Sequence, residues 1–230
     1  MMSVLSQQSF TNETMQHQFY PYDNNSGSIV AIAGEDFVVI ASDMRLTTGY
    51  SIFSRNQSKL FKLSNNAVLG TSGCWADVLT FRKYLEARTR MYKFEHNTDI
   101  DTPALAQLIS NMLYFKRFFP YYISTILAGL DENGKGCVYH YDPIGNFEKA
   151  IYKSAGSSSA LLQPLLDNQI GRKNIEGGVE TKPSLSDAVT IIKDVFLSAA
   201  ERDIHTGDGV NLTVITPDGI KEEVFPLRRD

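Results

Sequence analysis

The sequence predicts an α+β protein in which strands and helices form separate layers. Along the chain, the hydrophobic periodicity indicates four strands, two helices, about three strands, two helices and two strands. No stretch between them is long or polar enough to act as a linker, so the 230 residues are predicted to form one domain. With 43% hydrophobic and 21% charged residues, such a chain can bury roughly 70% of its unfolded surface. Packed layers of sheet and helix are the economical way to do so.

The first predicted strands form two hairpins. The runs 28–33 and 37–42 flank a turn at 34–36, and the runs 60–63 and 67–72 flank a turn at 64–66. The first two runs are apolar at nearly every position, which predicts strands buried on both faces. The residues before Ser28 are rich in Gln, Ser, Thr and Asn and show neither the helical nor the strand period of apolar residues. They are therefore predicted to be an extension outside the core.

Two helices follow in tandem. The first is predicted to extend to about Phe94, and its inward residues are Trp75, Val78, Leu79, Leu85 and Tyr92. The second is predicted to begin with Thr102 as the N-cap and Pro103 at the first helical position, and Pro120 stops it.

The second half of the chain returns to strands and then to helices. Strands are predicted over 121–128, 138–141 and about 147–152, with turns at 131–136 and 142–145. Helices are predicted over 158–169, kinked or shortened by Pro164, and over about 186–202. A closing hairpin joins 211–216 to 220–225.

The composition excludes several classes of function. Lys and Arg number 22 against 26 Asp and Glu, a net charge of −4, which argues against nucleic acid as a main partner. Cys74 and Cys137 are expected to be buried free thiols, and the four histidines have no metal-ligand spacing, so we expect neither a metal nor another cofactor. No run approaches the ~18 apolar residues of a membrane span, and no signal peptide is recognisable. The protein is therefore expected in the cytoplasm and nucleus, without a membrane partner.

Three local motifs suggest chemistry, but each has a simpler structural interpretation. The turn 131–136 begins like a calcium loop but lacks the later ligands, so a hairpin turn is favoured. The segment 114–122 interleaves aromatic and basic residues as nucleic-acid platforms do, but in an acidic chain we favour core packing or a contact between subunits. The segment 156–159 opens a helix whose N–H groups could bind an anion, although serine helix caps explain it on their own.

The arrangement of motifs is more informative than any one of them. The segments 42–45, 72–77, 156–159 and 201–208, together with Lys59, occur in an order and spacing that resemble a proteasome β subunit over about residues 18 to 230. Four further segments, 32–37, 117–122, 166–169 and 200–203, are similar to one subunit type of that family rather than to its ring neighbours. The resemblance implies the N-terminal-nucleophile hydrolase fold, a four-layer αββα sandwich of two antiparallel sheets between helical layers.

The same resemblance implies partners and a reaction. Members of this family assemble with other α and β subunits into a 28-subunit barrel that degrades proteins, and assembly chaperones and regulatory particles are indirect partners. The family mechanism uses a threonine that becomes the first residue after precursor cleavage. Its hydroxyl attacks the peptide carbonyl while its own α-amine, or water, accepts the proton.

In this chain the nucleophile position is a glycine. The family interval of sixteen residues before Asp43 leads to Gly27, which has no side chain. By resemblance, the other site positions are Asp43 and Lys59 as the supporting pair, Gly73 in the oxyanion hole, and Ser157, Asp203 and Thr206 around the α-amine. We therefore expect no catalytic residue, and a structural subunit of a seven-membered β ring in which these positions are vestigial. A buried Asp43–Lys59 pair would also stabilise the fold without any reaction.

Two alternatives compete with this interpretation. In the first, the chain is an active peptidase whose nucleophile is Ser28 or Ser26. Both are one residue out of register, and such a shift turns a strand side chain to the opposite face. Trp75 also stands where active members usually carry a small residue beside the substrate pocket, and it is expected to fill that space. In the second alternative the chain is a free-standing binding module, which would be a monomer.

The N-terminal arm is predicted to be removed. Residues 18–22 resemble the start of a mature subunit, which predicts cleavage between His17 and Gln18. Residues 1–17 would then be a propeptide and 18–230 a single β-type domain. Because the chain lacks its own nucleophile, the cut is expected to be made in trans by an active neighbour.

Overall fold

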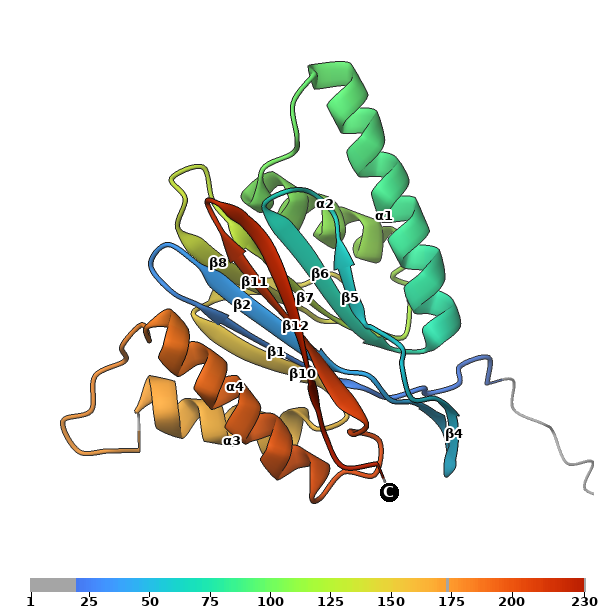
Figure 1. Ribbon diagram of the computed structural model, residues 1–230. Coiled ribbons are helices and arrows are strands. Elements are labelled where there is room, and N and C mark those ends of the chain that lie inside the picture. The colour runs from blue at the N-terminus through green and yellow to red at the C-terminus, as the bar shows by residue number, and fades with distance from the viewer. Residues whose placement is uncertain (1–19, 173, 230) are drawn as a thin grey trace, which may run out of the picture.

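The computed structural model describes residues 20–172 and 174–229. Over these residues the chain forms four layers, in which two five-stranded antiparallel sheets stack face to face and helices cover both outer sides (Figure 1). The predicted α+β class and αββα sandwich are confirmed. Residues 1–17, and the predicted cleavage point between His17 and Gln18, lie outside the described residues.

The first sheet carries the strands on which the predicted site depends. Its order is β10 (Tyr152–Gly156), β1 (Ser28–Ala33), β2 (Val38–Asp43), β11 (Gly209–Thr216) and β12 (Gly219–Pro226). Every residue of β1 and β2 is buried, as their apolar sequences predict. Ser28 pairs with Gly156, and Ile29 pairs with Ser42, so the beginning of β1 lies beside the ends of β2 and β10.

The second sheet has the order β5 (Leu60–Lys62), β6 (Ala67–Gly73), β7 (Ile123–Leu130), β8 (Gly136–Tyr141) and β9 (Phe147–Ala150). The single strand predicted over 147–152 is wrong, because the chain leaves the second sheet after β9 and enters the first as β10. The residues of this run suit either strand, so periodicity does not reveal where the pairing partner changes. Periodicity also does not predict the short hairpin of β3 (Leu46–Thr48) and β4 (Ser51–Ser54).

The helices differ from prediction mainly at their ends. They are α1 (Trp75–His96), α2 (Thr102–Phe115), α3 (Ser159–Leu166) with a following π turn η1 (Asp167–Gly171), and α4 (Leu185–Ala200). The N-cap of α2 is Asp101 and not Thr102, because the Asp101 carboxylate accepts from the N–H of Ala104. The Thr102 hydroxyl instead donates to the carbonyl of Leu130 in the second sheet.

The inward face of α1 also differs from prediction. Leu79 is exposed, whereas Phe81 is buried between Val78 and Leu85 on the face that packs on the second sheet. At the other side of the molecule, α3 ends at Leu166 and η1 continues it, two residues after Pro164. Proline has no N–H for the helical ladder, which accounts for the predicted shortening.

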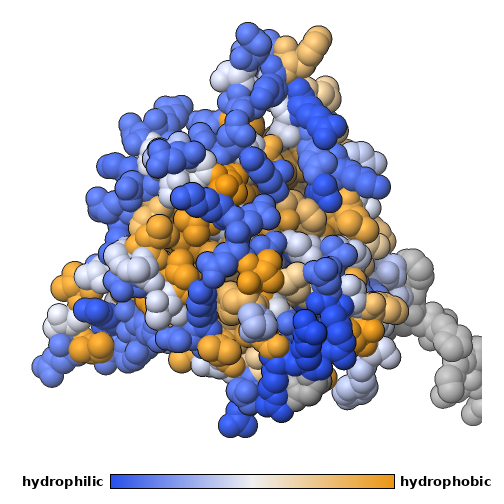
Figure 2. All heavy atoms as spheres, in the orientation of Figure 1, coloured by the Kyte–Doolittle hydropathy of each residue, from blue (hydrophilic) through white to orange (hydrophobic). Residues whose placement is uncertain are grey.

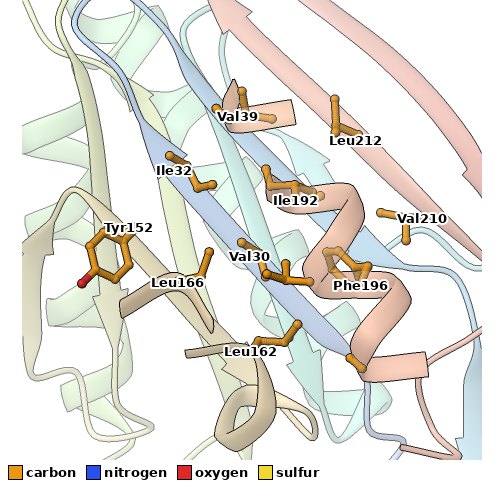
Figure 3. Packing of buried hydrophobic residues seen from close by; sticks show 14 of the residues in the cluster. Val30, Ile32, Val39, Tyr152, Leu162, Leu166, Ile192, Phe196, Val210 and Leu212 are labelled. Carbon is orange, nitrogen blue, oxygen red and sulfur yellow. The ribbon is translucent and has the colours of Figure 1, made fainter. Parts of the chain in front are cut away.

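Three hydrophobic clusters hold the layers together. In the first, Val30 and Ile32 of β1 and Val39 of β2 point toward residues of α3 and α4, which include Leu162, Leu166, Ile192 and Phe196 (Figure 3). The second cluster packs α1 and α2 on the second sheet. The third lies between the sheets and contains the alternate β1 residues Ile29 and Ala31. Strand β1 is therefore held from both faces, which gives its first residues fixed positions.

The surface mixes hydrophilic and hydrophobic residues, as one face shows in Figure 2. Among the helices of the described residues, none has both the length and the apolar character to cross a bilayer. Both cysteines are buried and free, as expected. The turn 131–136 is the hairpin between β7 and β8, in which the Asp131 carboxylate accepts from the N–H groups of Asn133 and Lys135.

Candidate functional site

The site is built around a fully buried ion pair between Asp43 and Lys59. Asp43 is the last residue of β2, and Lys59 directly precedes β5, so the pair joins the two sheets. The Lys59 Nζ lies 3.0 Å from each carboxylate oxygen of Asp43, and it also donates to the backbone carbonyls of Asp43 and Arg45 at 3.1 and 2.6 Å. Both side chains are 0% exposed. Each charge is therefore compensated by the other and by fixed backbone groups.

Burial governs the acid–base properties of this pair. It raises the pKa of the Asp43 carboxyl, and the charge of Lys59 and the backbone donors of Ser28 and Arg45 oppose that rise. Burial likewise lowers the pKa of the Lys59 amine, and the Asp43 carboxylate opposes the fall. The Ser28 N–H donates to Asp43 Oδ1 at 2.7 Å, so the beginning of β1 is tied directly to the pair.

Gly27 directly precedes β1 and faces Lys59. A Cβ placed on Gly27 would lie 2.6 Å from Lys59 Cδ and 3.2 Å from Nζ, and nearer still to Cε. The backbone φ of Gly27 is +112°, which side-chain-bearing residues rarely adopt. The position that resemblance assigns to the nucleophile is therefore close to the lysine, but the lysine side chain fills the space that a nucleophilic side chain would need.

A second cluster surrounds the carboxylate of Asp203. Asp203 Oδ2 accepts hydrogen bonds from Ser157 Oγ and Thr206 Oγ1, both at 2.8 Å, and from Ser158 Oγ. Ser28 Oγ lies 2.8 Å from Thr206 Oγ1 and accepts from the Ser158 N–H at 3.2 Å. Ser28 thus connects the two clusters, with its N–H on Asp43 and its hydroxyl on the Asp203 cluster.

The hydrogen bonds around Asp203 determine its protonation. Burial alone would raise the pKa of this carboxyl, but three hydroxyl donors and the backbone N–H of His205 outweigh burial and hold the pKa below its usual value. The charged form is therefore the one that the cluster stabilises.

We expect Asp203→Asn to destabilise the protein at pH 7 and to have a smaller effect as the pH falls. Because the folded pKa of Asp203 is below its unfolded value of about 3.9, the stabilisation is fully present above that value and is lost as the pH falls through the folded pKa. Hydrogen bonds to a charged group suggest a loss of about 1 kcal/mol at pH 7, after a discount for partial exposure.

Urea unfolding of both proteins between pH 7 and pH 3 measures this effect. Asp218→Asn, in the exposed turn between β11 and β12, is the matched control and should be neutral throughout. A stability difference for Asp203→Asn that does not shrink with falling pH would contradict the assignment.

The chain itself lies across the site next to Gly73. The Asn25 N–H donates to the Gly73 carbonyl at 3.0 Å, and the Gly73 N–H donates to the Ser26 carbonyl at 3.4 Å. On the other side, the Thr47 N–H donates to the Asn25 carbonyl at 3.4 Å. The oxyanion-hole donor suggested by resemblance is therefore engaged by a peptide bond of the same chain. Residues 25 and 26 lie between Thr47 and Gly73 and are held to both by backbone hydrogen bonds.

The remaining cavity beside Gly27 is small. It has a volume of about 260 Å³ and is lined mainly by small residues, which include Ser26, Gly27, Ser72, Gly156 and Ser157. Trp75 does not line this cavity, and the expectation that it fills the substrate pocket stays a prediction. The Trp75 ring packs against Phe61 at 6.3 Å between ring centroids, and the backbone N–H of Trp75 donates to Asn25 Oδ1 at 2.8 Å.

The backbone N–H groups at 156–159, which by sequence could bind an anion, are partly engaged by the chain itself. The Ser157 N–H donates to the Gly27 carbonyl, and the Ser158 N–H donates to Ser28 Oγ. The expectation that serines cap this helix is also wrong for Ser158, whose hydroxyl binds Asp203 and Thr206 and makes no capping bond. Tertiary partners have replaced the local capping bond.

The structure adds supporting residues that the sequence analysis missed. Arg45, which is 4% exposed, donates to Asp208 Oδ2 at 2.8 Å and to the Ile204 carbonyl at 2.8 Å. This pair fixes the segment that carries Asp203 to the end of β2. Arg45 and Asp208 both fall in segments that carry the family resemblance, but they are 163 positions apart, so no local pattern indicates their pairing.

All seven positions suggested by resemblance come together at the beginning of β1. A family model described as "Proteasome subunit" matches residues 23–215. The chain belongs to the proteasome subunit family. Family membership and the two stacked sheets agree with the expected N-terminal-nucleophile hydrolase fold.

The names of similar proteins indicate which type of proteasome subunit this chain resembles. "Proteasome subunit beta type-1" of Drosophila melanogaster is 53% identical over 219 residues, which cover 94% of this chain and 93% of the relative. The protein of the same name from Danio rerio is 50% identical over 216 residues, 94% and 91% of the two chains. "Proteasome subunit beta type-6" of Saccharomyces cerevisiae is 41% identical over 229 residues, 96% and 95%. The resemblance to the sixth β subunit, called type-1 or type-6 according to nomenclature, is confirmed.

Proposed function

We propose that this chain is a non-catalytic, structural β subunit of the 20S proteasome core. It completes a seven-membered β ring, while sister subunits carry out the threonine-protease chemistry. The observation that carries the proposal is the nucleophile position, where Gly27 has no side chain and Lys59 fills the adjacent space. The peptide across Gly73 supports it, because that peptide occupies the place next to the site where a substrate would need to bind.

The geometry of the two serines argues against the active alternative. Ser28 is 0% exposed, and its hydroxyl points into the Asp203 cluster rather than toward Lys59. Ser26 is buried, has a φ of +59°, and presents its carbonyl to Gly73. Neither hydroxyl has a bond to Lys59 among the contacts of the described residues. A peptidase would need one of them beside a base and an open substrate cleft.

We expect that a covalent inhibitor directed at N-terminal nucleophiles will label sister subunits of the purified particle but not this chain. The sister subunits are the internal control, because they show that the reagent is active. Mass spectrometry of the separated subunits provides the measurement. An adduct on Ser28 or Ser26 would overturn the non-catalytic assignment.

The proposed partners are the other α and β subunits of a 28-subunit barrel in the cytoplasm and nucleus, with assembly chaperones and regulatory particles as indirect partners. Membership of the proteasome family and the exposed aromatic side chains on α1 and α2 support an assembled state. In cell extract, the chain should elute from a sizing column with a particle of several hundred kilodaltons. Elution only as a monomer would favour a free-standing module.

We further propose that residues 1–17 are removed in trans, with cleavage between His17 and Gln18. Support comes from the missing nucleophile at Gly27, without which the chain has no group to cut itself. Intact-mass measurement of the subunit from mature particles should give a chain that begins at Gln18. A mass that retains Met1 or Met2 would contradict the proposal.

A further inference from the structure

The hairpin of β3 and β4 belongs to neither of the two large sheets. It forms a separate two-stranded sheet, and the residues of β4 are exposed or only partly buried. Figure 1 shows β4 projecting away from both five-stranded sheets. A two-stranded hairpin on its own is at best marginally stable in water, so other segments must hold this one in place.

The segment that precedes β1 supplies hydrogen bonds to this hairpin. Residues 22–26, called here the strap, include the buried Asn25. The Asn25 Nδ2 group donates to the Thr47 carbonyl at 3.0 Å and to Thr48 Oγ1 at 2.9 Å. The Thr47 N–H donates in return to the Asn25 carbonyl at 3.4 Å. Both the side chain and the backbone of Asn25 are therefore bound to β3.

Asn25 also holds the beginning of α1. The first N–H groups of a helix have no partner within the helix, and Cys74, the N-cap residue of α1, makes no side-chain capping bond. The N–H of Trp75, the first residue of α1, donates instead to Asn25 Oδ1 at 2.8 Å. Asn25 is therefore a helix cap supplied from 50 positions away, and its amide group binds α1 and β3 at the same time.

Tyr22 fixes the other end of the strap. Its hydroxyl donates to the Pro120 carbonyl at 2.8 Å, and the centre of its ring lies 5.4 Å from that of Tyr122 and 5.9 Å from that of Phe119. These three partners lie in the connection between α2 and β7. Because the strap is attached at Tyr22 as well as at Asn25, it can keep the hairpin in a fixed position.

The hairpin forms one wall of a cavity of about 490 Å³. Thr47 and Tyr50 line the cavity from the hairpin, and the opposite wall includes residues 200–206, the segment that carries Asp203. Thr47 Oγ1 and His205 Nδ1, one from each wall, lie 2.9 Å apart. The position of the hairpin therefore determines the shape of the space next to the Asp203 cluster.

We propose that the strap locks the β3–β4 hairpin to the beginning of α1, with Asn25 as the positioning residue. Release of the strap would let the hairpin move away from residues 200–206 and widen the cavity between them. The lock persists after the proposed cleavage between His17 and Gln18, because the strap follows the cut. It does not depend on the non-catalytic assignment, so labelling of Ser28 would overturn the proposed function and leave the lock intact.

Hydrogen exchange of the full chain, resolved to single amides by mass spectrometry, tests the lock. Asn25→Ala should raise exchange severalfold in the hairpin and at the Trp75 N–H, and leave β1 and β2 unchanged. Asn25→Asp keeps an oxygen for the Trp75 N–H but has no N–H group for Thr47 and Thr48. It should therefore raise exchange in the hairpin and not at Trp75.

The matched control is Asn133→Ala, in the exposed turn between β7 and β8, which should leave the hairpin unchanged. Equal exchange of the hairpin in Asn25→Ala and in this control would overturn the proposal. So would a loss of protection in the hairpin that occurs only together with β1 and β2, because Asn25 would then stabilise the whole fold rather than the hairpin.

A second measurement follows the width of the cavity. Spin labels are attached at Tyr50→Cys and Ile204→Cys, one on each wall, where the native side chains are 96% and 58% exposed. Cys74 and Cys137 are buried and should not take the label. The distance between the labels, measured by pulsed electron paramagnetic resonance, should become longer and more broadly distributed with Asn25→Ala. A distribution that does not change would overturn the proposed release of the hairpin.

Discussion

Lys59→Ala is expected to destabilise the protein by about 3–5 kcal/mol, because it leaves the Asp43 carboxylate buried without its partner. Both side chains are fully buried, so solvent cannot replace the lost ammonium. The Lys59 Nζ also holds the carbonyls of Asp43 and Arg45, and both would lose a donor. Urea unfolding of the purified chain measures the loss, and the yield of assembled particles provides a second readout.

Two further variants separate the buried charge from general effects of losing a lysine. Lys59→Met combined with Asp43→Asn removes both charges and should cost less than Lys59→Ala alone, because no uncompensated ion remains. Lys193→Met removes an exposed pair with Glu223 and should change stability by no more than about 1 kcal/mol. If Lys59→Ala were as mild as Lys193→Met, the pair would have no structural role.

Gly27→Thr is expected to destabilise the protein and to restore no peptidase activity. The new Cβ would collide with Lys59, whose Nζ is held by four hydrogen bonds and cannot move without breaking them. Crowding a packed site costs about 1–3 kcal/mol, and the positive φ adds about 1–2 kcal/mol. Urea unfolding and labelling by the N-terminus-directed inhibitor measure the two outcomes.

The contribution of crowding can be separated from that of the backbone. Gly219 also has a positive φ outside the left-handed helical region, +131° against +112° at Gly27, but a Cβ at this position has nothing within 4 Å. Gly27→Ala should therefore destabilise the protein more than Gly219→Ala, because only Gly27→Ala displaces Lys59. Equal changes in the free energy of unfolding would show that Lys59 moves aside at no cost. Inhibitor labelling at position 27 in particles that carry Gly27→Thr would show that a side chain was all that the site lacked.

Local sequence patterns predicted most of the framework of this protein. The unbroken apolar runs of β1 and β2 are buried on both faces, and the turn residues at 131–136 form the expected hairpin. These features depend on near neighbours in the chain, which the sequence displays directly. The pairing of Arg45 with Asp208, and the change of sheet between β9 and β10, depend on partners that are distant in the chain. No local pattern encodes such partners.

The aromatic segment 114–122 is a second case in which local sequence did not predict the structure. The expected core packing is wrong for Phe115 and Phe118, because Phe115 lies on the exposed side of the last turn of α2 and Phe118 lies in the turn beyond it. The alternative expectation, a contact between subunits, stays a prediction. Similarly, Ser158 has the sequence position of a helix cap, but Asp203 and Thr206 offer its hydroxyl stronger partners. In both cases tertiary geometry overrode a local preference.

The sequence alone determined that position 27 carries no nucleophile, because glycine has no side chain whatever its surroundings. It also determined the order of most strands and helices along the chain, because their apolar periods are local. The tertiary structure decided that Lys59 fills the space beside Gly27, that Ser28 turns its hydroxyl to Thr206, and that the chain binds across Gly73. These facts depend on side-chain directions and distances between strands, which exist only once the two sheets have packed together.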